Sequence, residues 1–366
     1  ATDLAAVNNN LGVALRARGD LAGAIATFER ARTIYARLVE REGRADLAND
    51  LAMIDNNLGL VLRARGDLAG AIAAYERART IRARLVEGEG RTDLANDLAT
   101  VDNNLGTALL ARGDLAGAIA AHERARTICA RLVEREGRDD LANDLARVDN
   151  NLGNALVTRG DLAGAIAAYE RARSIYARLV EGEGRDDLAN DLASVDNNLG
   201  IALGDRGDLA GAIAAHERAR AIHARLVEGE GRDDLLPDLC RTTFNEILLL
   251  RSEAKLTWIW LWWSVRTALR SLLPRRLHQR NPDPQMSLGG GRATYPPSKD
   301  VVELKANLIE QVGRLATSVE GRTGRLSEAA RTELIDVLRL ACSLSWWPPD
   351  AKVELERALS LLESNR

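Results

Sequence analysis

Apolar positions along the first two thirds of the chain fall at helical spacing in short, paired runs. In one such stretch they run from Leu94 to Leu109 and again from Leu115 to Val133, at intervals of three and four residues. This spacing places them on one side of a helix. Between the runs Gly113 is a typical helix stop, and Asp114 is a typical cap for the next helix. The pattern predicts two antiparallel helices joined by a very short turn, the first of them capped by Asp93.

The same unit occurs five times with a constant period. The string Asn-Asn-Leu-Gly begins at Asn9, Asn56, Asn103, Asn150 and Asn197. A fixed period of this length is typical of stacked repeats, in which each helix pair covers an apolar face of its neighbour. A glycine inside a helix costs about 1 kcal/mol relative to alanine. We interpret the Gly106 set in the first helix, and the Gly117 set in the second, as points where two helix backbones approach closely.

The unit resembles the tetratricopeptide repeat. The resemblance rests on Leu105-Gly106 in the first helix and on Ala118, His122 and Ala125 in the second. The Asn-Asn-Leu-Gly motif and the long repeat unit are most similar to the kinesin-light-chain type of this repeat. The period exceeds the roughly 34 residues usual for the family, and the family's inter-repeat proline is absent. The resemblance covers residues 1–233 and implies an all-α fold, a right-handed α-solenoid of stacked helix hairpins.

The five copies differ at a few positions of the first helix, and these positions share one stripe of its surface. The stripe lies roughly opposite the apolar stripe of Leu4, Val7, Leu11 and Leu15, so we expect it to face away from the core. The variable columns read Ala6, Met53, Thr100, Arg147, Ser194; Val13, Leu60, Thr107, Asn154, Ile201; Arg16, Arg63, Leu110, Val157, Gly204; and Ala17, Ala64, Ala111, Thr158, Asp205.

One column within this stripe never changes, namely Asn9, Asn56, Asn103, Asn150 and Asn197. An amide side chain offers one acceptor and two N–H donors, which suits it to holding a peptide backbone of any sequence. In proteins similar to this one the first helices line a concave groove, and asparagines there often hold a peptide.

We therefore predict a peptide-binding groove. The constant Asn9 column would hold the ligand backbone, and the variable columns would contact its side chains. The variable residues that we expect to contact ligand are Met53, Thr100, Arg147, Ser194, Leu60, Thr107, Asn154, Ile201, Arg63, Leu110 and Val157. The alternatives are that the Asn9 column is solvated or bridges adjacent repeats, and that the variable columns drift neutrally. The next constant column, starting at Asn10, is expected to bond between helices.

Two columns of the second helix vary without a clear stripe. They read Phe28, Tyr75, His122, Tyr169, His216 and Tyr35, Arg82, Cys129, Tyr176, His223. They either edge the groove or fill the contact between repeats, and we favour packing. Charges such as Glu29, Arg30, Arg37 and Glu40 are interpreted as solvated helix faces. The five Arg-Gly-Asp tripeptides, as at Arg18-Gly19-Asp20, each span a helix stop and the next cap.

Composition and motifs exclude several functional classes. The net charge is −3 and charged residues make up 28% of the chain, so the basic footprint of a nucleic-acid binder is missing. The sequence contains no phosphate loop, metal-ligand cluster or nucleophile elbow. We therefore expect no enzymatic activity, no metal and no cofactor. Three scattered cysteines, Cys129, Cys240 and Cys342, suit a reducing compartment such as the cytoplasm.

The chain after the repeats has a different composition. Residues 234–277 are predicted to form a degenerate helix pair, rich in tryptophan, that caps the array. Alternatively its tryptophans, above all Trp258, Trp262 and Trp263, lie on a membrane surface or dock a partner or a second copy. Residues 278–299 have the proline and glycine content of a linker. Residues 300–366 are predicted to form a small helical domain with helices at 301–319, 327–345 and 349–362.

These observations favour a scaffold that binds a peptide or protein segment in the concave groove. The chain begins at Ala1, and residues 2–4 align with Asn96-Asp97-Leu98 inside a repeat, so we expect it to be a fragment. We expect it to be the sensor or adaptor arm of a larger bacterial signalling or defence protein. The alternatives are a self-assembling module, joined through the array ends or the tryptophan segment, and a peripheral membrane adaptor.

Overall fold

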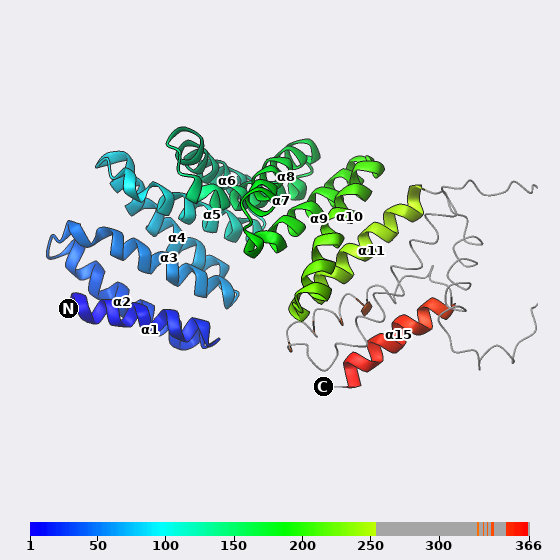
Figure 1. The fold of residues 1–366 in the computed structure, drawn as a ribbon. Coiled ribbons are helices and arrows are strands. Elements are labelled where there is room, and N and C mark those ends of the chain that lie inside the picture. The colour runs from blue at the N-terminus through cyan, green and yellow to red at the C-terminus, as the bar shows by residue number, and fades with distance from the viewer. Residues whose placement is uncertain (254–327, 329–331, 333–334, 336–337, 340–348, 365–366) are drawn as a thin grey trace, which may run out of the picture. The chain divides into compact units, whose positions relative to one another are not determined.

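The computed structural model describes residues 1–253, 328, 332, 335, 338, 339 and 349–364 (Figure 1). Two compact units make up the chain, Ala1–Leu188 and Ala189–Arg366. The described part contains helices and turns but no strand, and the all-α prediction is confirmed. The tryptophan segment and the linker lie outside the described residues, as does nearly all of the two helices expected at 301–345.

The first unit consists of four stacked helix hairpins (Figure 1). Their helices are α1 (Thr2–Ala17) and α2 (Leu21–Glu40), α3 (Ala48–Ala64) and α4 (Leu68–Ala83), α5 (Ala95–Arg112) and α6 (Leu115–Ala130), and α7 (Ala142–Arg159) and α8 (Leu162–Ala177). The second unit contains the fifth hairpin, α9 (Ala189–Arg206) and α10 (Leu209–Ala224), followed by α11 (Leu236–Glu253) and α15 (Pro349–Ser364). α15 confirms the last helix expected from the sequence.

The turn inside each hairpin has the chemistry that the sequence predicts. Gly113 ends α5 with a φ of 88°, in the left-handed region that glycine enters without strain. Asp114 caps α6, because its carboxylate accepts a hydrogen bond from the Gly117 amide at 2.9 Å. Arg112-Gly113-Asp114 is thus a helix stop followed by a cap, and the structural interpretation of the Arg-Gly-Asp tripeptides is confirmed.

The start of the first helix differs from the prediction. A 3-10 turn, Thr92–Leu94, precedes α5, and the N-cap residue is Leu94, without a side-chain cap. The Asp93 carboxylate instead accepts hydrogen bonds of 2.9 and 2.7 Å from the Arg91 guanidinium. The predicted Asp93 cap is therefore wrong. An arginine two residues away supplies two charge-assisted donors, which outcompete the single backbone amide of a cap.

The two glycine columns do not mark contacts between helix backbones. A β-carbon on Gly59 would lie 2.6 Å from Cε1 of Tyr75, a ring atom in the partner helix α4. A β-carbon on Gly117 would lie 2.7 Å from Oδ2 of Asp114, the cap of its own helix. Our interpretation is corrected in both cases. The first glycine makes room for a ring, and the second makes room for a capping carboxylate.

In the first unit, α3, α5 and α7 are each packed between their own second helix and the second helix of the preceding repeat. In α3 the apolar stripe is covered, and Leu51, Ile54 and Leu58 are exposed by 4, 0 and 5%. In α1 the equivalent Leu4, Val7 and Leu11 are exposed by 58, 62 and 47%. The expected core stripe of α1 is therefore an open surface, because in the described part of the chain no second helix precedes α1.

Candidate functional site

The variable columns of the first unit lie on the accessible side of the first helices. In α3, Met53, Leu60 and Arg63 are half-buried, whereas Ile54 and Val61 beside them are fully buried. The remaining variable residues follow the same pattern. Thr100, Thr107, Leu110, Asn154 and Val157 are half-buried and Arg147 is exposed; in the second unit Ser194 is half-buried and Ile201 exposed. The surface is accessible, and its contact with a ligand remains a prediction.

The two constant asparagine columns bond to each other across neighbouring first helices. Asn57 on α3 donates its amide to Oδ1 of Asn9 on α1 at 3.1 Å. Asn104 and Asn151 donate in the same way, at 3.1 Å, to Asn56 and Asn103. The second unit repeats the bond at 3.0 Å from Asn245 to Asn197. The expectation that the Asn10 column bonds between helices is confirmed for its members at 57, 104 and 151.

This ladder changes what the Asn9 column can offer. Asn103 is only 4% exposed, and its Oδ1 accepts from both Asn151 and Nδ1 of His122. The column therefore bridges repeats, which was one of the two alternatives. In the described part of the chain, however, the amide nitrogens of Asn56 and Asn103 make no hydrogen bond. What remains for a ligand is the amide N–H groups of Asn56 and Asn103, which suit backbone carbonyl groups.

The large residue of each second helix reaches through to this face. The Tyr169 ring packs against Gly153, and its hydroxyl donates to Oδ1 of Asn154 at 2.7 Å. The tip of this side chain thus meets a variable position of the first helix. Tyr75 occupies the equivalent position in repeat 2, where Leu60 replaces Asn154. Its hydroxyl is buried without a hydrogen bond of good geometry.

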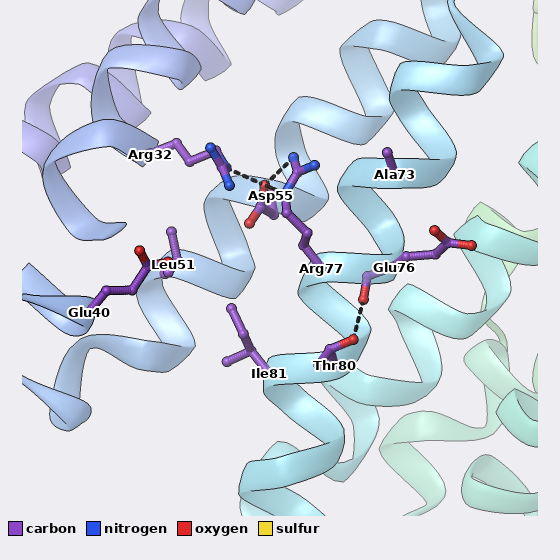
Figure 2. Close-up of a pocket in the computed structure, with 9 residues that line it drawn as sticks. All are labelled: Arg32, Glu40, Leu51, Asp55, Ala73, Glu76, Arg77, Thr80 and Ile81. Atoms are coloured by element: carbon purple, nitrogen blue, oxygen red, sulfur yellow. Dashed lines mark hydrogen bonds and ion pairs between the residues drawn. The ribbon is translucent and has the colours of Figure 1, made fainter. Parts of the chain in front are cut away.

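Sequence reasoning missed a set of buried ionic bridges between repeats. Figure 2 shows Asp55 on α3 between Arg32 of the preceding repeat and Arg77 of its own repeat. Arg32 Nε donates to Asp55 Oδ1 at 2.9 Å, and Arg77 donates to the same oxygen at 2.9 and 2.6 Å. The carboxylate is 1% exposed, while the arginines are 35 and 38% exposed.

The bridge recurs at the next two junctions. Asp102 joins Arg79 and Arg124, and Asp149 joins Arg126 and Arg171. The signal was present in the sequence, because an aspartate precedes Asn-Asn in every repeat but the first. There Asn8 takes its place, and Arg30 on α2 is exposed as predicted. Its equivalents in the later repeats, starting with Arg77, instead form ion pairs with the buried aspartate of their own repeat.

An open pocket of about 480 Å³ lies over the first of these bridges (Figure 2). α2 and α4 supply its walls, and Leu51 and Asp55 of α3 form part of its floor. Both arginines that face it are already committed to Asp55. The pocket is therefore explained as the surface of an inter-repeat contact.

The second variable column of the second helices is buried. Tyr35, Cys129 and Tyr176 are at most 4% exposed. Arg82 is 5% exposed and donates to the Asn49 side chain and the Asp97 carbonyl. The packing interpretation is confirmed for this column. Burial also raises the pKa of the Cys129 thiol to about 12, and Cys129 and Cys240 are both free.

Three buried histidines hold their imidazoles in the neutral form. Burial lowers the pKa of His122, His216 and His223 to about 4. Each has one ring nitrogen without a hydrogen-bond partner. Across the described residues no group of three side chains could hold a metal ion. No described helix combines the length and apolar character needed to cross a bilayer.

The repeat positions decide the family. The family profile of the tetratricopeptide repeat matches residues 4–43, 51–89, 98–139, 150–187 and 192–234. The chain belongs to the tetratricopeptide repeat family. As a tetratricopeptide repeat protein it is a scaffold for protein–protein interaction. Which partner it binds, and where, is not given by the family.

Several solved structures are similar to this tetratricopeptide repeat protein. BtubC (BKLC) from P. vanneervenii is 22% identical, with 75% of this chain and 99% of that chain covered and a TM-score of 0.49. A kinesin-light-chain-type protein from Podosopora anserina with nearly identical TPR-like repeats is 19% identical, with 61 and 96% covered and a TM-score of 0.45. MamA is 18% identical, with 59 and 96% covered and a TM-score of 0.38. At this similarity none of them bears on what the chain binds.

No curated protein matches the chain in sequence. The tryptophan segment with Trp258, Trp262 and Trp263 lies outside the described residues, so its capping, docking and membrane roles remain predictions.

Proposed function

We propose that the chain binds an extended segment of a partner protein across the first-helix face of residues 1–188. One observation carries the proposal: a constant row of asparagine amides runs beside columns that vary from repeat to repeat on an accessible surface. A constant donor row suits the backbone, which is the same in every peptide. Variable neighbours suit side chains, which differ.

The geometry of the asparagine ladder limits the kind of contact. The Asn56 and Asn103 carbonyl oxygens are engaged by Asn104 and Asn151, whereas their amide nitrogens make no hydrogen bond within the described residues. A ligand therefore meets N–H groups, which bind the carbonyl oxygens of an extended chain. Neighbouring packed helices lie roughly 8–10 Å apart, which is about three residues of extended peptide at about 3.3 Å per residue.

The test uses peptides selected from a random phage-displayed library on the full chain. Asn56→Asp with Asn103→Asp keeps the oxygen acceptors for the ladder but removes the free N–H donors. We expect the selected peptide to bind this variant at least about fivefold more weakly, since two hydrogen bonds of about 0.5–1.5 kcal/mol each are lost. Fluorescence anisotropy gives the affinity, and circular dichroism checks the fold.

A charge-matched control separates this effect from electrostatics. Ala45→Asp with Thr92→Asp adds the same two charges just before α3 and α5, at exposed positions where later repeats carry Asp139 and Asp186, and it should leave the affinity within about twofold. Unchanged affinity in the Asn56/Asn103 variant, with intact helix content, would remove the asparagine row from the mechanism.

The same proposal places the chain as the sensor or adaptor arm of a larger bacterial signalling or defence protein in the cytoplasm. Free, buried cysteines at 129 and 240 support a reducing compartment. Sequencing the complete gene tests the arrangement, because an ATPase or protease module upstream would make the repeats its regulatory arm.

Self-association is a second candidate, favoured by the open apolar face of α1. Leu4, Val7 and Leu11 are about half exposed, although their equivalents in α3 are buried. A second copy that covers this face would remove apolar area from water. Sedimentation of the wild type and of Val7→Glu over a wide concentration range tests this. A strict monomer in both would rule it out.

A further inference from the structure

The open face of α1 has the same apolar side chains as the covered face of α5, but a different polar group at its centre. Its leucines and valine are exposed by 47–62%, whereas the same residues on α5 are at most 4% exposed. The matching residues are Leu4, Val7 and Leu11 on α1 and Leu98, Val101 and Leu105 on α5. Between them α5 carries Asp102, and α1 carries Asn8. The α1 face therefore keeps the apolar residues of a contact between repeats but lacks its carboxylate.

Inside the array this carboxylate holds two arginines together. Asp102 accepts a hydrogen bond of 2.9 Å from Nε of Arg79, on the helix that covers α5, and one of 2.6 Å from Arg124 of its own repeat. The bridges at Asp55 and Asp149 have the same composition. One negative charge thus lies between two positive charges at each of these contacts. Without the carboxylate the two guanidinium groups would repel each other.

The first repeat keeps its own arginine although it lacks the carboxylate. Arg30 on α2 is the equivalent of Arg124, and within the described residues it makes no ion pair. Because Arg124 reaches Asp102 from this place on the second helix, Arg30 can reach the open face beside Asn8. Asn8 is uncharged, and its amide nitrogen donates to the Leu4 carbonyl at 2.8 Å. The centre of the α1 face is therefore positively charged, with apolar residues around it.

This charge limits the kind of helix that can cover α1. A helix like the one that covers α5 would bring an arginine over Asn8 and next to Arg30, with no carboxylate between the two. Like charges placed together in an interface oppose binding. All five second helices carry this arginine, namely Arg32, Arg79, Arg126, Arg173 and Arg220. A second copy of the chain that presented one of its second helices would therefore fit the α1 face poorly.

We infer that the α1 face binds an amphipathic helix of a partner protein that carries a glutamate or aspartate at the centre of its apolar stripe. The carboxylate accepts charge-assisted hydrogen bonds from Arg30 and an N–H group of Asn8. The apolar residues around it cover Leu4, Val7 and Leu11 and remove them from water. This face lies opposite the variable stripe of α1, so the inference goes beyond the proposed function and does not depend on it.

The test is selection on the full chain from a phage-displayed library of amphipathic helices, with the central position of the apolar stripe randomised. The wild type, Asn8→Asp and Arg30→Gln are used in parallel, and Arg41→Gln removes the same charge at an exposed position directly after α2. The wild type and Arg41→Gln should enrich glutamate or aspartate at the randomised position. Asn8→Asp restores the carboxylate of the inner repeats and should enrich arginine instead. Arg30→Gln should lose the acidic preference.

Affinities of one synthesised helix selected on the wild type complete the test. Its binding should weaken at least about fivefold in Arg30→Gln, and as much when its acidic residue is changed to the amide, because a charge-assisted hydrogen bond is lost. Val7→Glu should abolish binding of this helix and leave the affinity of a peptide selected for the groove unchanged. Circular dichroism checks that each variant is folded.

Three results would overturn the inference. The first is a selection in which the wild type shows no acidic preference, or in which Asn8→Asp keeps the same preference as the wild type. The second is that no protein of the set retains a helix, which would leave the groove proposal standing. The third is a concentration-dependent dimer of the wild type that Val7→Glu dissociates, since a second copy would then cover the α1 face.

Discussion

The imidazole of His122 lies so close to Gly106 that a β-carbon on this glycine would be 2.7 Å from its Cε1 and Nε2 atoms. The glycine is therefore needed for a ring to cross between the two helices of the hairpin. We expect Gly106→Ala to lower the free energy of unfolding by up to about 2 kcal/mol. Overpacking costs about 1–3 kcal/mol, against about 1 kcal/mol gained in helix propensity. Urea denaturation measures the difference.

Gly88 gives a matched control for this substitution. It ends the π-helical turn Arg84–Gly88 that follows α4, and the nearest atom to an added β-carbon is Arg84 Cγ at 3.9 Å. Gly88→Ala should leave the unfolding midpoint unchanged or raise it slightly. Equal loss in the two variants would contradict the ring-clearance explanation.

The buried Asp102 carboxylate should matter more than any exposed acid of the repeat. It accepts three N–H groups on one oxygen, from Arg79 at 2.9 Å and from Arg124 at 3.0 and 2.6 Å. Breaking a fully buried pair costs about 3–5 kcal/mol. Here the arginines are 33 and 40% exposed and can turn to water, so we expect Asp102→Asn to cost about 1–3 kcal/mol in urea denaturation.

Asp93 is the comparison for Asp102, because it also binds an arginine but at an exposed site. Asp93→Asn should leave the unfolding midpoint unchanged, since exposed ion pairs contribute little. If Asp102→Asn also left it unchanged, the bridge between repeats would have no role in stability.

The fold could be predicted from the sequence because repetition multiplies a weak local signal. Gly113 and Asp114 have equivalents in every repeat, so the helix stop and the following cap were secure. The cap at Asp93 failed for a local reason: Arg91, two residues earlier, offers better hydrogen bonds than a single backbone amide. Propensity rules for single positions do not weigh such a competitor.

The candidate site was only partly predictable. Helical geometry placed Met53, Leu60 and Arg63 on an accessible stripe, in agreement with their burial. It could not show that the carbonyl oxygens of the Asn9 column are taken by the following repeat, because that contact joins residues 48 positions apart. The Asp55 bridges were missed for the same reason. From the sequence alone a charged residue of a helix is assigned to the solvent-exposed face, because the packing of the neighbouring helices is not known.

Cys129 should be nearly inert in the folded protein. It is 1% exposed, and burial raises the pKa of its thiol to about 12, with the charge of Asp144 adding to the effect. Thiolate is the reactive form, so alkylation at pH 8 should be at least about 100-fold slower in the native protein than in urea. Peptide mass spectrometry assigns the label to this residue. Rapid native labelling would show that the contact between repeats 3 and 4 opens readily.

Acid should destabilise the repeats that contain buried histidine. Burial lowers the pKa of His122 to about 4 from an ordinary value near 6.5. At a pH between these two pKa values, His122 binds a proton in the unfolded chain but not in the folded chain. The stability contributed by neutral His122 is therefore complete above pH 6.5, falls as the pH drops towards 4, and is lost below it. The total for this one residue is about 3 kcal/mol.

His122→Tyr isolates this effect from the titration of the carboxylates. Tyrosine fills the same position beside Gly59 and Gly153, so the variant should fold. Its hydroxyl stays neutral through the acid range, because burial raises tyrosine pKa values at this position. Urea midpoints measured from pH 7.5 to 4 should fall less steeply for His122→Tyr than for the wild type. Parallel curves would mean that His122 finds an acceptor for its second N–H when it is protonated, and that its burial does not oppose the charge.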